Sequence, residues 1–125
     1  MRLDTATASI NFPPLFSKMF GSRNTKIGLA VCILGSGLVV LTLGREGAVL
    51  LKSGEELARV PAFEVQVVDT TGAGDLYAAG FLYGYTRGMA PTACGKVGAI
   101  AAGEIISHFG ARPEASLADL VAKAL

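Results

Sequence analysis

Residues 69–75 carry two carboxylates, two hydroxyls and two glycines, a combination that could bind a phosphate group and accept a proton. We call them the DTTGAGD segment, and in order they are Asp69, Thr70, Thr71, Gly72, Ala73, Gly74 and Asp75. An apolar stretch typical of a β-strand precedes them, and a stretch typical of a helix follows. The N–H groups in the first turn of a helix have no partner within the helix, and the helix dipole favours an anion there. The segment therefore predicts an anion site at the first turn of the helix, where Gly72 and Gly74 allow a ligand to come close.

Asp75 places a negative charge beside this anion site, which is unfavourable unless the carboxylate has a chemical role. A hydroxyl that attacks a phosphoryl group must lose its proton, and a carboxylate within hydrogen-bond reach can accept that proton. We therefore expect Asp75 to act as a general base. The oxygens of Asp69 and Thr71 suit a hard cation or a hydrogen bond that fixes the loop. An ordinary alternative is that either of these two residues caps the following helix.

The elements that would position the DTTGAGD segment are strands before it and helices after it. We expect short strands at residues 38–43, 48–52, 57–61 and 64–68. The first of these is rich in β-branched and apolar residues, which is typical of a buried parallel strand. A glycine turn at 44–47 and a polar hairpin turn at 53–56 separate the first three strands.

Three helices are expected after these strands. They run from about residue 73 to 86, from 91 to about 108, and from 116 to 125, where an S-x-x-D pattern starts the last one. The middle helix is built almost entirely of small and aliphatic residues. It could form a flat wall for an adenine ring or pack closely in the core, and both interpretations stay open.

An uncharged run of 18 residues, Ile27 to Gly44, reaches the lower limit of length for a membrane-spanning helix. Gly35, Ser36 and Gly37 interrupt the run. We therefore expect the end of a helix, a glycine turn and then a strand, and a membrane-spanning helix remains the alternative. Residues 1–37 as a whole are unassigned, and the double proline at 13–14 breaks any regular element there.

Composition excludes several classes of protein. The chain has 125 residues and a net charge of +1, so it offers no basic surface for nucleic acid. Its two cysteines, Cys32 and Cys94, lie far apart in apolar surroundings and are expected to be buried thiols, as in a reducing cytoplasm. A single histidine excludes a Ser-His-Asp triad or a multi-histidine metal site within the chain.

The DTTGAGD segment resembles the C-terminal signature of the ribokinase-like sugar and nucleoside kinases, the PfkB family, which reads D-T-x-G-A-G-D. Two more segments resemble elements of that family in the same order along the chain. Residues 41–48, LTLGREGA, resemble the nucleotide-binding element T-x-G-x-x-G, and residues 110–113, GARP, resemble the G-A-x-P stretch. Within the family, the segments DLYAAGFLYG and ISHFGARP are most similar in sequence to those of bacterial adenosine kinase-like members. The resemblance covers residues 38 to 125.

This resemblance implies an α/β fold with a mostly parallel sheet and flanking helices, of which the chain holds only the C-terminal portion. It implies ATP as phosphoryl donor, Mg²⁺ as cofactor and a hydroxyl of a sugar or nucleoside as acceptor. Asp75 would be the base, and residues 72–74 the anion hole. The nucleotide-binding residues would be Thr42, Gly44, Gly47, Thr71 and Gly74. A monovalent cation such as K⁺ would bind near Asp69, Thr71 and Gly110.

Other elements of the family are not found in the chain. They are a glycine-pair motif and a central N-x-x-E motif, both of which lie upstream of the signature in the family. We therefore expect residues 38–125 to be the C-terminal, nucleotide-binding part of a cytoplasmic kinase. The alternative is a truncated, non-catalytic remnant that at most binds a nucleotide or a partner chain. In either case, apolar surface left uncovered would favour self-association.

Overall fold

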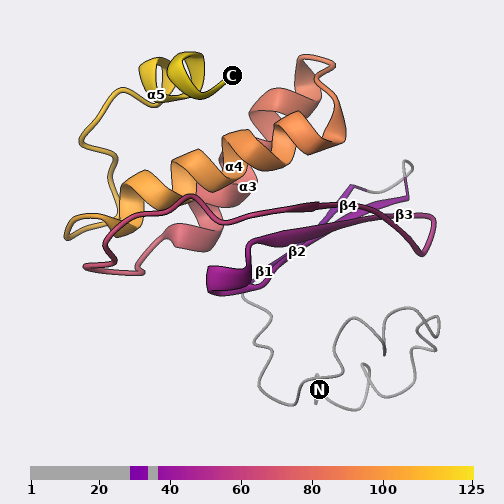
Figure 1. The fold of residues 1–125 in the computed structure, drawn as a ribbon, viewed down its shortest axis with the longest axis horizontal. Helices are drawn as coiled ribbons and strands as arrows, with labels where there is room; N and C mark the ends of the chain where they lie inside the picture. The colour runs from indigo at the N-terminus through magenta and orange to yellow at the C-terminus, as the bar shows by residue number, and fades with distance from the viewer. Residues whose placement is uncertain (1–28, 34–36) are drawn as a thin grey trace, which may run out of the picture.

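The computed structural model describes residues 29–33 and 37–125. Within these ranges one small sheet is covered by a pair of helices, and a short third helix lies on the far side of that pair (Figure 1). The strands are β1 (Leu29–Ile33), β2 (Leu38–Thr42), β3 (Ala48–Lys52) and β4 (Glu55–Val60). The helices are α3 (Ala73–Thr86), α4 (Pro91–Ile106) and α5 (Leu117–Ala124), and a short 3₁₀ helix, η1 (Gly44–Glu46), joins β2 to β3.

The four strands pair in sequence order, and every pair is antiparallel. The expectation of a mostly parallel sheet is therefore wrong for these strands, including residues 38–43. A continuous apolar run indicates that a strand is buried on both faces, but it does not indicate the direction of its neighbours. The connections decide the direction, because strands joined by turns of a few residues can only pair antiparallel.

Both faces of β2 and β3 are buried. On one face, Val40 and Leu50 belong to a core shared with Phe81 of α3 and Cys94 of α4. On the other face, a second cluster contains Leu41, Leu43, Val49 and Leu51. This two-sided burial explains why these strands carry no alternation of polar and apolar residues.

The turn between β3 and β4 is a tight hairpin. Ser53 and Gly54 both have positive φ, at 52° and 84°. Two consecutive residues with positive φ match the twist of the flanking strands. The hairpin predicted at residues 53–56 is therefore confirmed, although Glu55 and Glu56 already belong to β4.

Two other expectations are wrong. Residues 29–33 form a strand that pairs with β2 along its whole length, where we expected the end of a helix. Residues 64–68 are not a strand. They run along α4 instead, and the N–H groups of Val68 and Asp69 both donate to the carbonyl oxygen of Ile106, at 2.8 and 3.2 Å. A helix end thus supplies the acceptor that a neighbouring strand would have provided.

Helices α3 and α4 pack closely because small residues lie between them. A Cβ atom added at Gly80 would lie 2.8 Å from the carbonyl oxygen of Val97, and one added at Gly98 would lie 2.9 Å from that of Tyr77. The predicted bounds of α3 are confirmed, and α4 ends two residues earlier than expected. At the start of α5, the Oγ of Ser116 accepts a hydrogen bond from the N–H of Asp119, which confirms the predicted cap.

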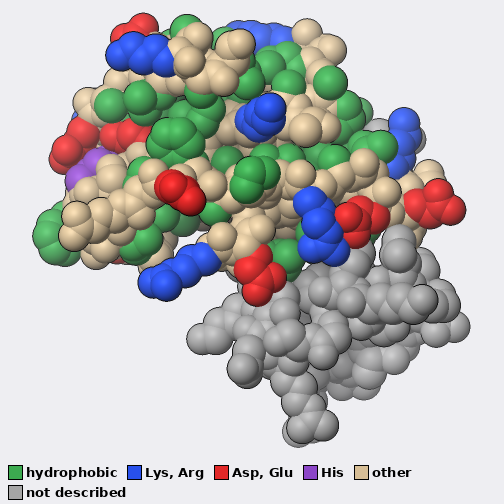
Figure 2. All heavy atoms as spheres, viewed as in Figure 1, with side chains coloured by type: hydrophobic (Ala, Val, Ile, Leu, Met, Phe, Trp, Pro, Cys, Tyr) green, Lys and Arg blue, Asp and Glu red, His purple; other side chains and the backbone are tan. Residues whose placement is uncertain are grey.

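No helix among the described residues is long and apolar enough to cross a membrane. The described parts of the uncharged run at 27–44 are β1 and residues 37–44, which contain β2, and residues 34–36 of the expected glycine turn lie outside the described residues. The double proline at 13–14 lies outside the described residues. On the face shown in Figure 2, basic and acidic side chains of the described residues alternate over the surface.

Candidate functional site

The turn between β2 and β3 forms one wall of the candidate site. The N–H of Leu43 donates to the carbonyl oxygen of Gly47 at 2.7 Å, which closes the turn around η1. Gly47 has a φ of 90°, and a Cβ atom there would lie 2.1 Å from the carbonyl oxygen of Val60. Only glycine fits this position, so the second glycine of T-x-G-x-x-G is required by the fold. We call residues 42–47 the glycine turn.

The DTTGAGD segment begins with a hydrogen-bonded loop. Asp69 Oδ1 accepts hydrogen bonds from the N–H of Thr71 at 2.9 Å and from its Oγ1 at 2.6 Å. Asp69 Oδ2 accepts a third from the N–H of Gly110 at 3.2 Å. These bonds, the one from the Thr71 hydroxyl first, hold the pKa of Asp69 below its ordinary value. Asp69 therefore remains ionised and ties the segment to the loop after α4.

Neither Asp69 nor Thr71 caps helix α3. The N-cap residue is Gly72, with a φ of 81°, and no side chain bonds to the first turn. The N–H of Ala73 donates to the carbonyl oxygen of Thr70, and the N–H of Leu76 is the next to find an acceptor. Within the described part of the chain, the N–H groups of Gly74 and Asp75 have no acceptor. Two backbone donors are thus open at the start of α3, as an anion site requires, and the anion site itself stays a prediction.

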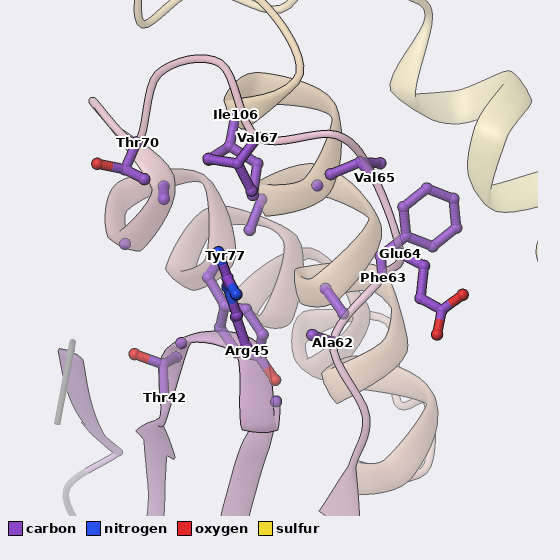
Figure 3. Close-up of a pocket in the computed structure, with 17 residues that line it drawn as sticks. Thr42, Arg45, Ala62, Phe63, Glu64, Val65, Val67, Thr70, Tyr77 and Ile106 are labelled. Atoms are coloured by element: carbon purple, nitrogen blue, oxygen red, sulfur yellow. The ribbon is translucent and has the colours of Figure 1, made fainter. Parts of the chain in front are cut away.

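A cavity of about 960 Å³ separates the glycine turn from the start of α3 (Figure 3). Five of the predicted site residues line it, and they come from segments more than 25 residues apart in sequence. They are Thr42, Gly44, Gly47, Ala73 and Gly74. The tertiary structure therefore brings the two glycine-rich segments together around one space.

The rest of the cavity wall is largely apolar. It is formed by the segment after β4 and by α4, and its apolar members are Ala62, Phe63, Val65, Val67, Ala99, Ala102, Gly103 and Ile106. Other small residues of α4 serve packing instead: a Cβ atom at Gly95 would lie 2.7 Å from Val60 Cγ2. The small residues of α4 thus serve packing at some positions and line the cavity at others, and a wall for an adenine ring stays a prediction.

The remaining predicted residues lie outside the cavity lining. Asp75 is exposed beside the start of α3, and Gly72 and Thr71 form the turn before it. Asp69, Thr71 and Gly110 do come together, through the hydrogen bonds of the Asp69 carboxylate. Among the described residues, no group of three or more His, Cys, Asp or Glu side chains could hold a metal ion.

Two cavity residues were missed by the sequence analysis. Arg45 is exposed and also lines the cavity from the glycine turn. Tyr77 belongs to the buried core and also lines the cavity from α3. Its hydroxyl is buried without a hydrogen-bond partner, and burial raises its pKa to about 12. Helical spacing could have indicated Tyr77, because it lies three residues after Gly74 on the same face of α3.

A buried ion pair holds the loop that follows α4. Glu104 Oε1 accepts hydrogen bonds from His108 Nε2 at 3.0 Å and from the N–H groups of Glu114 and Ala115, both at 2.9 Å. Burial by itself would raise the pKa of Glu104, but the bonds from Ala115, Glu114 and His108 outweigh it and the pKa is lowered. The bond to the carbonyl oxygen of Phe109, and then the carboxylates of Glu104 and Glu114, raise the pKa of His108. His108 thus forms an ion pair with Glu104 of α4.

Comparison with known proteins identifies the family. Residues 16–117 match the family described as pfkB family carbohydrate kinase, so the chain belongs to that family. It is 40% identical over 96 residues to an "Uncharacterized sugar kinase" of Archaeoglobus fulgidus, a match that covers 76% of this chain and 38% of that protein.

Solved structures of related proteins share the fold of the part of this chain that they match. The adenosine kinase from Sinorhizobium meliloti is 50% identical with a TM-score of 0.68, over 71% of this chain and 27% of that one. A probable sugar kinase from Rhizobium etli is 47% identical with a TM-score of 0.67, over 70% and 27%. The predicted family and the ribokinase-like fold are confirmed. The chain spans about a quarter to two fifths of the length of these relatives.

Proposed function

We propose that this chain is the nucleotide-binding part of a kinase that transfers the terminal phosphoryl group of ATP to a hydroxyl of a sugar or nucleoside. One observation carries the proposal: the glycine turn and the start of α3 face the same cavity. The apolar wall of α4 suits a base, and the open N–H groups at the other side suit phosphates. In support, the ribokinase from Cryptococcus neoformans, 32% identical with a TM-score of 0.59, was solved in complex with ADP.

We assign a role in phosphoryl transfer to each residue at the start of α3 from its position there. The N–H groups of Gly74 and Asp75 would donate to oxygens of the transferred phosphoryl group, where negative charge develops. The Asp75 carboxylate, exposed at the same helix start, would accept the proton of the attacking hydroxyl. We infer adenosine or a related nucleoside as the acceptor, supported by the 50% identity to an adenosine kinase.

Mg²⁺ would supply charge neutralisation on the phosphates of ATP. The described residues of this chain contain no cluster of acidic side chains that fits the ion, so its binding would rest on the phosphates. A monovalent cation such as K⁺ near Asp69, Thr71 and Gly110 fits only in part. Both oxygens of the Asp69 carboxylate already accept hydrogen bonds, and Gly110 faces that carboxylate with its N–H. We derive no step through either ion.

Substitution of Asp75 tests the proposal. Asp75→Asn should lower phosphoryl transfer from ATP to adenosine by about 10²-fold or more, because a general base contributes roughly that factor. The affinity for ATP should change less than twofold. Activity is measured by a coupled ADP assay and affinity by calorimetry, with the exposed Asp119→Asn as the matched control. Equal turnover by the Asp75→Asn variant and the wild type would refute the role of Asp75.

A non-catalytic chain that only binds nucleotide is the second candidate. It is favoured by the place of Asp75, which is exposed and lies outside the cavity lining. The same pair of assays separates the two candidates. Affinity for ATP without any turnover by the wild-type chain supports binding alone, and turnover that Asp75→Asn removes supports the kinase.

A further inference from the structure

Arg45 is the only basic residue that lines the cavity among the described residues. It belongs to η1, and its side chain makes no hydrogen bond or ion pair with another described residue. In Figure 3 the side chain rises from the glycine turn toward the start of α3. Arg45 is exposed, so the five N–H donors of its guanidinium group are open to solvent and to a ligand in the cavity.

The only other charged side chain in the lining belongs to Glu64, which in Figure 3 points away from the cavity. Its carboxylate therefore does not pair with Arg45, and no ion pair involving either residue is formed within the described chain. The positive charge of Arg45 is thus available to an anionic ligand in the cavity.

Two further groups at the cavity can donate a hydrogen bond and have no acceptor among the described residues. The Tyr77 hydroxyl is buried in a residue only 6% exposed and has no partner. Because its pKa is raised to about 12, the hydroxyl keeps its proton at neutral pH and can donate it. The N–H of Gly74 is open at the start of α3. Donors without acceptors around one space indicate a ligand rich in acceptors and negatively charged.

The backbone at Arg45 is held in place, which favours a binding role. Gly44 and Gly47 both have positive φ, at 59° and 90°. The N–H of Gly47 donates to the carbonyl oxygen of Gly44 at 3.1 Å, and the N–H of Glu46 donates to that of Leu43 at 3.2 Å. Binding a ligand would therefore cost only the side-chain freedom of Arg45 and not an ordering of the turn.

We propose that Arg45 binds the phosphate groups of the nucleotide across the cavity from the start of α3, and that it gives the site its preference for nucleotides that carry phosphates. This inference rests on the proposed function and adds to it a specific phosphate-binding side chain. The planar guanidinium matches two phosphate oxygens at once, which a lysine ammonium does not. Arg45 and the helix start would hold the phosphates from opposite sides, and the apolar wall of α4 would be left for the base.

The test compares two ligands, ATP and adenosine, in calorimetric titrations of the whole chain. Arg45→Gln should weaken ATP about tenfold, because a charge-assisted hydrogen bond is lost, and should change adenosine less than twofold. Arg45→Lys should fall between the wild type and Arg45→Gln. Lys52→Gln is the matched control, since it removes the same charge at the opposite end of β3 and should leave both affinities unchanged.

Each outcome has a definite meaning. Equal ATP affinity in Arg45→Gln and wild type overturns the inference and leaves the proposed function intact. Equal losses for ATP and adenosine also overturn it, because they indicate that Arg45 contacts the base or supports the turn. Failure of the wild-type chain to bind ATP at all overturns the inference together with the proposed function. A tenfold loss confined to ATP supports both.

Discussion

At the scale of single residues, the candidate site depends on polar groups that the protein itself leaves unpaired. The Tyr77 hydroxyl and the N–H of Gly74 are such groups, and both border the same cavity. A buried polar group without a partner lowers stability, so its presence in a fold indicates either a functional need or a bound partner. At Tyr77 this cost can be measured in the ligand-free protein.

Tyr77→Phe should raise the free energy of unfolding of the ligand-free chain by about 1 kcal/mol, because it removes a buried donor that has no acceptor. Chemical denaturation of the wild type and the variant measures the difference. Tyr85→Phe is the control, since Tyr85 is exposed on the same helix and should show no change. A loss of stability in Tyr77→Phe would mean that the hydroxyl has a partner in solution.

At the scale of elements, the loop after α4 is held by charges at both of its ends. Glu104 bonds to His108 at the start of the loop and to the N–H groups of Glu114 and Ala115 at its end. The same loop is joined to the DTTGAGD segment, because the N–H of Gly110 donates to Asp69. The loop thereby connects the end of α4 to the start of α3 without belonging to either helix.

Because of this ion pair, the free energy of unfolding should fall both below and above a narrow range of pH. The pKa of Glu104 is lowered from 4.5, so its contribution is complete above pH 4.5 and is lost as the pH falls through its folded-state pKa. The pKa of His108 is raised from 6.5, so its contribution is complete below pH 6.5 and is lost as the pH rises through its folded-state pKa. The pair therefore contributes most between pH 4.5 and 6.5.

Glu104→Gln should lower the melting temperature most within that range and flatten its dependence on pH at both edges. Melting curves from pH 3.5 to 8.5 measure the effect. The control is Glu46→Gln, an exposed carboxylate without a partner in the described part of the chain, which should leave the profile unchanged. Parallel profiles for wild type and Glu104→Gln would contradict the role of the pair.

At the scale of the whole molecule, the sheet and the helices meet around the cavity. A ligand that spans the cavity contacts the glycine turn and the start of α3 together, so it should stabilise the described fold as a unit. Several apolar side chains remain exposed, Phe109 at 79% among them. Self-association through such surface stays a prediction.

ATP at about 100 times its dissociation constant should therefore stabilise the chain by about 2.7 kcal/mol, visible as a rise in melting temperature. Gly47→Ala should remove most of this rise, because a Cβ atom there meets the carbonyl oxygen of Val60 at 2.1 Å and distorts the turn. Gly88→Ala is the control: Gly88 also has positive φ, at 74°, but nothing lies within 4 Å of an added Cβ. An equal ATP effect in both variants would show that the glycine turn does not contact the nucleotide.

Local patterns in the sequence predicted much of this protein. Glycines, caps and apolar runs act over a few residues. The sequence could therefore predict four local features, which are helix α3, the hairpin turn at Ser53, the turn at residues 44–47 and the cap at Ser116. The DTTGAGD segment indicated an anion site for the same reason, since a strand, a glycine turn and a helix start are joined by adjacent bonds.

The tertiary structure alone decided what depends on distant neighbours. The direction of the strands followed from which segments pair, and residues 64–68 bonded to Ile106 of α4 instead of a strand because α4 ends beside them. The glycine turn and the start of α3 border one cavity through the packing of segments distant in sequence, and only that packing shows that Arg45 and Tyr77 line it. Residue types and spacing determined the chemistry available, and long-range packing determined which groups meet.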